Sequence, residues 1–192
     1  MKQISVILWI FTVQNCLALN LHSKPLSGES VFQIESSWND QDGNKFSLSA
    51  LRGKISVVAM AYTSCQGACP IIISDMQKIE KDLKPSLLSQ THFILISFDS
   101  ERDTPTQLKK FAKAHHLDPR HWTLLTGTPK SVRELAATLS IKYKKDADGD
   151  FSHSNVITVL DSEGIILHQQ LGLRQNAQNS VESISDASKQ IR

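Results

Sequence analysis

Two nearly continuous apolar segments constrain the fold of this chain more than any other feature. Residues 55–61 read ISVVAMA and residues 92–98 read HFILISF, and neither segment alternates polar with apolar side chains. A strand of this kind is buried on both faces, which is typical of a parallel sheet covered by helices. We therefore expect both segments inside a central sheet.

Helical patterns alternate with these strands. Residues 70–83 carry apolar side chains at intervals of four, three and four, which places them on one helix face: Ile72, Met76, Ile79 and Leu83. Thr104-Pro105 and Thr128-Pro129 each combine an N-cap residue with a proline suited to the first helical turn, so each predicts a helix start. With Gln107, Thr104 also forms a capping box.

The rest of the chain continues the pattern. We expect a short strand or turn entry at 46–48, a strand at 122–125, and a hairpin whose arms are 156–160 and 165–168. A last helix carries Val181, Ile184 and Ile191. The alternation predicts an α/β domain of three layers.

Length and charge exclude several classes of protein. A chain of 192 residues suits one domain that buries a sizeable core without help from disulfides. Its 21 Lys and Arg residues against 19 Asp and Glu give a net charge of +2, too small for the concentrated basic face that nucleic acid requires. We expect no nucleic-acid partner.

The first residues resemble a secretory signal. A positive start, Met1-Lys2, precedes a run of about ten apolar residues that is too short for a typical membrane span of about 20. We expect residues 1–18 to be a signal peptide, 19–30 a linker and 31–192 the folded domain, in an extracytoplasmic location such as the bacterial periplasm. An uncleaved membrane anchor is the alternative.

Cleavage after residue 18 would remove Cys16 and leave Cys65 and Cys69 of the three cysteines. This pair lies between a predicted strand and a predicted helix, and the N–H groups at a helix start stabilise a thiolate. A structural disulfide is the alternative, although so short a loop would add little stability. The spacing favours a metal-binding or redox pair.

Two thiolates suit Cu(I), an added imidazole suits Cu(I) and Cu(II), and a zinc site usually needs four protein ligands. Of seven histidines, six are expected at the surface or at helix and strand ends: His22, His92, His115, His116, His121 and His168. His153 differs because it lies just before the strand at 156–160, where functional groups gather in α/β sheets. The acidic loop 146–150 before it lacks the spacing of an EF-hand and is expected to be a surface turn.

Four segments in order resemble the Sco/SenC family of copper-binding cytochrome c oxidase assembly proteins, over about residues 31–172. They are Asp42-Gly43 with SLSALRGK at 47–54, YTSC-QGA-CP at 62–70, SFDSERDTP at 97–105, and Ser152-His153-Ser154 ahead of Leu160-Asp161 and Gly164. One departure is Gln66, where the family commonly has proline.

The resemblance implies a thioredoxin-like three-layer fold with a central mixed sheet flanked by helices. It also implies that Cys65, Cys69 and His153 bind one copper ion, as Cu(I) or Cu(II). The expected function is a copper metallochaperone whose partner is the copper-site subunit of cytochrome c oxidase or another copper or thiol acceptor. Asp99 and Asp103 match the third segment and are expected to stabilise the turn and the helix start near Thr104.

Two other functions use the same cysteines. In a thiol–disulfide oxidoreductase, one of the pair attacks a disulfide of the partner and the other resolves the mixed disulfide. Membrane association through the N-terminus is compatible with either function. A peroxiredoxin-type peroxidase fits less well because the segment before Cys65 lacks the proline and spacing of that class.

Overall fold

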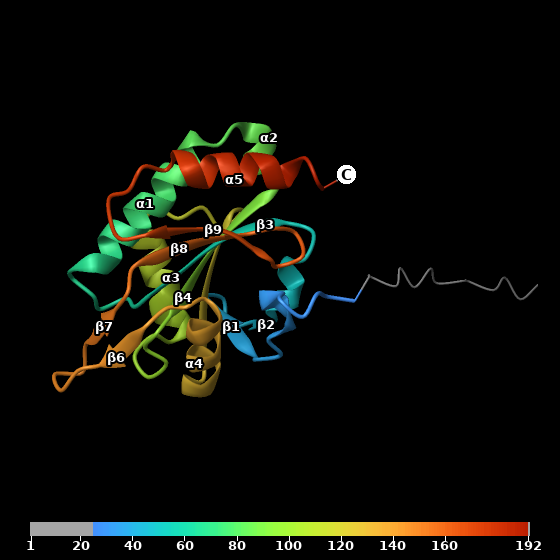
Figure 1. Ribbon diagram of the computed structural model, residues 1–192. Helices are drawn as coiled ribbons and strands as arrows, with labels where there is room; N and C mark the ends of the chain where they lie inside the picture. Colours follow the sequence, from blue (N-terminus) through green and yellow to red (C-terminus); the bar gives the residue numbers. More distant parts are fainter. Residues whose placement is uncertain (1–24, 192) are drawn as a thin grey trace, which may run out of the picture.

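The computed structural model describes residues 25–191 (Figure 1). The expected signal peptide, 1–18, and the first part of the expected linker, 19–24, lie outside these residues. Within the described part of the chain, no helix has the length and apolar character needed to cross a membrane.

A mixed sheet of seven strands forms the centre of the domain, in the order β2-β1-β5-β4-β3-β8-β9. Strands β3, β4 and β5 are parallel, and the other neighbouring pairs are antiparallel. The strands are β1 (Trp38–Asp40), β2 (Lys45–Phe46), β3 (Ile55–Ala61), β4 (Thr91–Ser97), β5 (Trp122–Gly127), β8 (Val156–Leu160) and β9 (Ile166–Leu171).

Helices cover both faces of the sheet. They are α1 (Ala68–Asp82), α2 (Pro85–Leu88), α3 (Pro105–Ala114), α4 (Pro129–Thr138) and α5 (Gln178–Ser188). Helices α1 and α5 lie on one side and α4 on the other (Figure 1). Helix α3 ends beside α1, where the Gln77 side chain donates to the His115 carbonyl at 2.9 Å. The expected three-layer α/β fold is confirmed.

The predicted helix starts are confirmed by their caps. The Thr104 hydroxyl accepts from the Gln107 N–H at 3.3 Å, and the Thr128 hydroxyl accepts from the Ser131 N–H at 3.1 Å. Each satisfies one of the backbone donors that a helix start leaves without a partner. Helix α1 starts two residues earlier than expected, at Ala68, so Cys69 lies inside its first turn.

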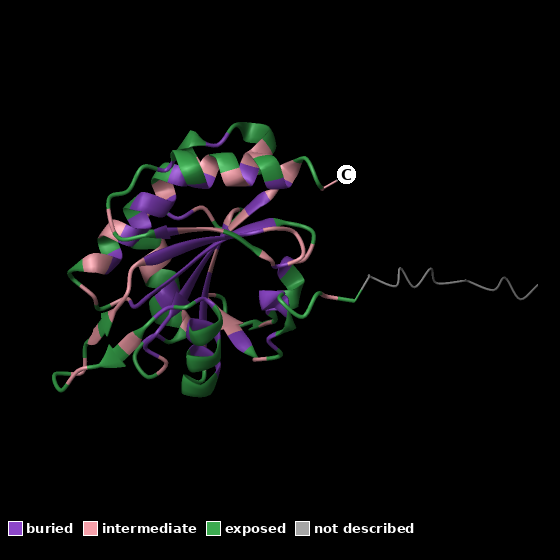
Figure 2. Cartoon of the chain, viewed as in Figure 1, coloured by how far each residue is buried: buried purple, intermediate pink, exposed green. Residues whose placement is uncertain are grey.

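The core lies on both faces of the sheet, as the burial colours show in Figure 2. All seven residues of β3 are buried, as the apolar run predicted. The sequence pattern missed β1, whose Trp38 is fully buried against Gly127. A Cβ at Gly127 would lie 2.5 Å from the Trp38 ring, so the close packing of indole on strand β5 requires glycine there.

The segment before β8 is more ordered than the sequence suggested. Instead of a loop leading to His153, the chain forms a two-stranded antiparallel sheet from β6 (Tyr143–Lys145) and β7 (Phe151–His153). The acidic residues 146–150 form its turn, with Gly149 at φ +88°. This hairpin is separate from the main sheet and extends beside it in Figure 1.

Candidate metal centre

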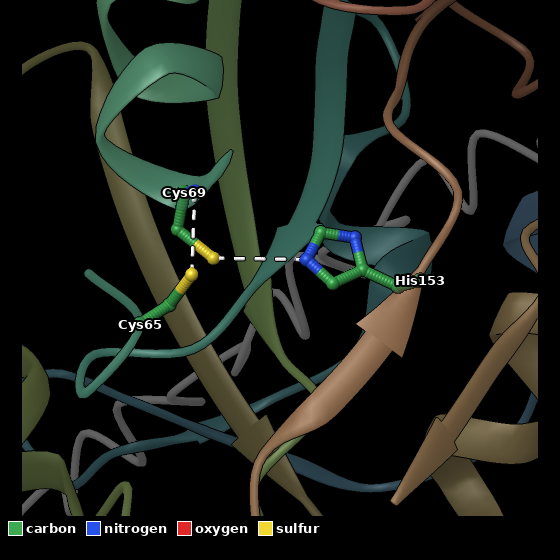
Figure 3. A group of neighbouring side chains, drawn as sticks. All are labelled: Cys65, Cys69 and His153. Carbon is green, nitrogen blue, oxygen red and sulfur yellow. Dashed lines mark hydrogen bonds between the residues drawn. The ribbon is translucent and has the colours of Figure 1, made fainter. Parts of the chain in front are cut away.

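The structure brings together the three residues that the sequence singled out. Cys65 lies in the loop after β3, Cys69 in the first turn of α1, and His153 at the end of β7. Their ligand atoms all lie within 4.8 Å of one another, and Cys69 Sγ is 3.8 Å from His153 Nε2 (Figure 3). Among residues 25–191, no other group of three or more His, Cys, Asp or Glu side chains is arranged to hold a metal ion.

Strand β3 and helix α1 hold the cysteine pair. The Cys65 N–H donates to the Tyr62 carbonyl at 3.3 Å, which turns the chain sharply after the strand. Gly67, the N-cap of α1, has no side chain to accept a helix N–H. The Cys65 sulfur takes this role by accepting from the Cys69 N–H at 3.4 Å. The start of α1 therefore holds the sulfur atoms of Cys65 and Cys69 next to each other.

The two thiols differ in environment. Burial alone would raise the pKa of Cys65, but hydrogen bonds from Cys69, from the backbone of Gly67 and from the Tyr62 side chain lower it below its ordinary value. Cys69 is fully buried, and this burial, together with the neighbouring Cys65, raises the pKa of the Cys69 thiol. Cys65, half-buried, is therefore the more accessible and more acidic thiol.

Tyr62 links the cysteine segment to the hairpin and was not identified from the sequence. Its hydroxyl accepts from the Phe151 N–H at 3.4 Å and bonds the Cys65 side chain. Burial raises the pKa of Tyr62 to about 12, with the Cys65 charge as a further cause, so the phenol stays protonated. The signal in the sequence was an aromatic residue carrying a hydroxyl at the end of a buried strand.

His153 is oriented by its neighbours. Its Nδ1 lies 3.2 Å from the Ser154 carbonyl, which can only accept, so Nδ1 carries the proton and Nε2 presents a lone pair toward Cys69. Burial lowers the pKa of His153, although the Ser154 contact opposes this shift. The ring also packs on Phe98, with ring centroids 5.0 Å apart. The imidazole is therefore held neutral, which is the form that binds metal.

Asp99 and Asp103 take different roles. Asp99, as expected, stabilises the turn by accepting from the N–H groups of Glu101 and Arg102. The carboxylate of Asp103 was expected at the helix start, but its hydrogen bonds go to the cysteine segment and to β4. It accepts from the Thr63 N–H at 2.9 Å, the Thr63 hydroxyl at 2.5 Å and the Ser97 hydroxyl at 2.5 Å. It thereby fastens the segment before Cys65 to β4.

The other described histidines lie away from this cluster. His92 lies near the start of β4, as expected, where it is half-buried and its Nε2 lies 2.9 Å from the Thr123 hydroxyl oxygen. Burial, followed by the charges of Lys54 and His121, lowers the pKa of His92 to about 4. His22 lies outside the described residues.

Donor type and spacing both fit copper. A first-row ion bound by sulfur and nitrogen at about 2.0–2.3 Å in a trigonal arrangement separates its ligand atoms by roughly 3.5–4 Å. The 3.8 Å between Cys69 Sγ and His153 Nε2 falls in this range. Two soft sulfurs with one imidazole match the preferences of copper in either oxidation state.

Known proteins share both the sequence pattern and the fold. The family model described as SCO1/SenC matches residues 26–188. The SCO1 protein homolog of Bacillus subtilis (strain 168) is 29% identical over 149 residues, which cover 76% of this chain and 77% of that protein.

Two solved structures extend the likeness. BsSco, a member of the Sco family of cytochrome c oxidase assembly proteins in which a disulfide switch was identified, is 27% identical with a TM-score of 0.71, covering 80% of this chain and 91% of that one. Bradyrhizobium japonicum ScoI with copper bound is 25% identical with a TM-score of 0.62, covering 80% and 96%. With its thioredoxin-like fold and its Cys-Cys-His cluster, the chain belongs to the SCO1/SenC family.

Proposed function

We propose that this protein binds one copper ion through Cys65, Cys69 and His153 and delivers it to the binuclear copper site of cytochrome c oxidase. The observation that carries the proposal is the convergence of two sulfurs and one correctly oriented imidazole nitrogen within 4.8 Å. Family membership and a copper-bound homologue support the choice of metal. The membership of BsSco in a family of oxidase assembly proteins supports the choice of acceptor.

The site favours transfer through Cys65. Copper is the cargo, and an acceptor thiolate can replace one protein sulfur at a time. Cys65 is half-buried and lies between two exposed residues, Ser64 and Gln66, whereas Cys69 is fully buried. An acceptor therefore reaches the Cys65 position first, while Cys69 and His153 retain the ion until a second acceptor ligand arrives.

Thiol–disulfide reduction is the second candidate, and the contrast between the two thiols favours it. The Cys65 thiolate attacks one sulfur of an acceptor disulfide, and the other acceptor sulfur leaves as a thiolate. Cys69 then attacks Cys65 and releases the second acceptor thiolate. Two thiols of this chain become one disulfide, and their two protons and two electrons pass to the acceptor cysteines.

The proposed place of action is outside the cytosol, in the periplasm, with residues 31–192 as the working domain and 1–18 as the export signal. The apolar run of the first residues supports this location. The periplasm is an oxidising compartment, in which the cysteines of an acceptor form disulfides. A reductase reaction would return those cysteines to the thiol form that binds copper. Fractionation of cells with antibody detection tests the location, and recovery in the cytosol would contradict it.

Copper titration of the reduced protein tests the main proposal. We expect one copper per chain, with binding lost in Cys65→Ser and Cys69→Ser and weakened in His153→Ala. Full one-to-one binding by the double cysteine variant would overturn it. Incubation of the copper-free protein with an oxidised acceptor peptide tests the second candidate, for which His153→Ala should retain activity and Cys65→Ser should not.

A further inference from the structure

The hairpin that carries His153 has few attachments to the rest of the domain. Within residues 25–191, strands β6 and β7 pair only with each other, so no ladder of backbone hydrogen bonds joins them to the main sheet. A two-stranded hairpin alone is marginally stable in water. Its base continues into β8, and its inner side packs on Phe98, whose ring lies 4.9 Å from that of Tyr143. These contacts involve the strands, so the turn at residues 146–150 must be held in place by another contact.

The Arg102 side chain binds this turn. Its Nη2 donates to the Gly149 carbonyl at 2.6 Å and lies 3.6 Å from an Asp150 carboxylate oxygen. Its Nε donates to Asp99, whose side chain is only 1% exposed. The guanidinium group thus bridges a buried carboxylate in the β4–α3 loop and the turn of the hairpin. A planar fork of donors can make both contacts at once.

The same loop holds the cysteine segment. Asp103, one residue after Arg102, accepts the hydrogen bonds of Thr63, two residues before Cys65. Loop 98–104 therefore contacts both halves of the candidate site: the cysteine side through Asp103 and the histidine side through Arg102. The separation between sulfur and imidazole depends on this loop.

We propose that Arg102 is a positioning residue that fixes the β6–β7 hairpin, and with it His153, over the cysteine pair. This inference rests on the proposed copper site. With Arg102 in place, the imidazole stands ready and copper binding need not order the hairpin. Without it, His153 joins the site only when the hairpin closes, and the apparent copper affinity is the intrinsic affinity multiplied by the closed fraction of the hairpin.

The two oxidation states of copper should respond differently. Cu(I) is satisfied by two thiolates, whereas Cu(II) depends more on the imidazole. Outer contacts that orient a metal ligand typically contribute 10- to 100-fold to affinity. Arg102→Ala should therefore weaken Cu(II) binding by about tenfold, with a smaller change for Cu(I).

A double-mutant cycle tests whether Arg102 acts through the histidine. Cu(II) affinity is measured for the unmodified protein, Arg102→Ala, His153→Ala and the double variant. We expect the tenfold effect of Arg102→Ala to disappear when His153 is already absent, because the hairpin then carries no ligand. An equal loss in both backgrounds would overturn the proposal, as would an unchanged affinity in Arg102→Ala. Arg120→Ala is the matched control, since it breaks an exposed arginine–aspartate pair with Asp118.

Hydrogen exchange gives a readout that needs no copper. Backbone amides in 143–153 should exchange faster in Arg102→Ala than in Arg120→Ala, while amides of β3 and β4 stay protected. Arg102→Lys keeps the positive charge but lacks the planar guanidinium group, so its hairpin amides should still exchange nearly as fast as those of Arg102→Ala. If Arg102→Ala does not fold, the lysine variant replaces it in both measurements. Full recovery in the lysine variant, or unchanged exchange of the hairpin, would refute positioning. Failure of the unmodified protein to bind copper would instead refute the proposed function.

Discussion

The cysteines and the histidine of the candidate site come from two regions of different construction. The cysteine segment joins β3, buried along its whole length, to α1, whose inner residues Ile72, Ile73 and Met76 are at most 1% exposed. The histidine lies on a hairpin outside the main sheet, held by aromatic packing, one tyrosine hydroxyl, Arg102 and the exposed Glu101–Lys145 ion pair. Two ligands lie where a core strand meets a core helix, and the third lies on a hairpin attached to the core. Such a site can keep its sulfurs fixed while the imidazole adjusts.

The largest effect should come from the core side of this comparison. Cys69→Ser removes a fully buried sulfur and should weaken copper binding by more than about 100-fold, beyond the range typical of losses outside the ligand set. Titration against a copper chelator of known affinity measures this loss. Serine is close to cysteine in size, so the thermal unfolding curve serves as the control for folding. A loss below tenfold would show that Cys69 is not a ligand.

The hairpin side should give a smaller and more selective effect. His153→Ala should weaken Cu(II) binding by more than the effect of about tenfold expected for Arg102→Ala but by less than Cys69→Ser, and Cu(I) binding should weaken less still, since both thiolates remain. The nitrogen coupling in the Cu(II) electron paramagnetic resonance spectrum should disappear with it. His116→Asn is the control, because it removes an exposed histidine at a position of φ 54° that asparagine tolerates. Equal losses of Cu(I) and Cu(II) affinity would contradict this prediction, because they would show that the imidazole is as important as the sulfurs for both ions.

A histidine of the main sheet that is not part of the ligand cluster, His92, sharpens the contrast. The pKa of His92 is lowered to about 4, whereas an unfolded histidine titrates near 6.5. Between these values the unfolded chain binds a proton that the folded chain does not. The free energy of unfolding should therefore fall as pH decreases from about 6.5 to 4, with His92 contributing at most about 3 kcal/mol, less what solvent screens at its half-buried ring.

Denaturant unfolding of the copper-free protein at several pH values measures this dependence. His92→Gln can keep a hydrogen bond to Thr123 but cannot titrate, so its curve should be flatter over the same window. Copper affinity at neutral pH should not change. An identical pH dependence in both proteins would show that the acid sensitivity comes from other groups.

The smallest effect should come from the exposed ion pair beside Arg102. Glu101→Gln breaks the 2.7 Å contact between Glu101 and Lys145 of the hairpin, where both side chains are largely exposed. Such pairs contribute about 0–1 kcal/mol, so stability and Cu(II) affinity should change little. Asp186→Asn, which breaks a similar pair with Lys189, is the control in α5. A loss as large as that of Arg102→Ala would show that any charge on this loop secures the hairpin.

The fold was largely predictable because local patterns carried it. Continuous apolar runs identified β3 and β4, and threonine–proline pairs identified the starts of α3 and α4. The pattern missed three short strands, β1, β6 and β7. β1 has three residues and takes its stability from Trp38 packing on distant Gly127, which no local window contains.

The candidate site divides in the same way. By itself the sequence determined the cysteine pair, because two thiols four positions apart at a helix start are chemically distinctive. Its resemblance to a family singled out His153. Only the tertiary structure decided that the imidazole nitrogen lies 3.8 Å from a sulfur, that Asp103 holds Thr63, and that Arg102 reaches Gly149. These contacts join residues 40 to 84 positions apart. Their formation depends on how the hairpin packs against the β4–α3 loop, which local propensity does not encode.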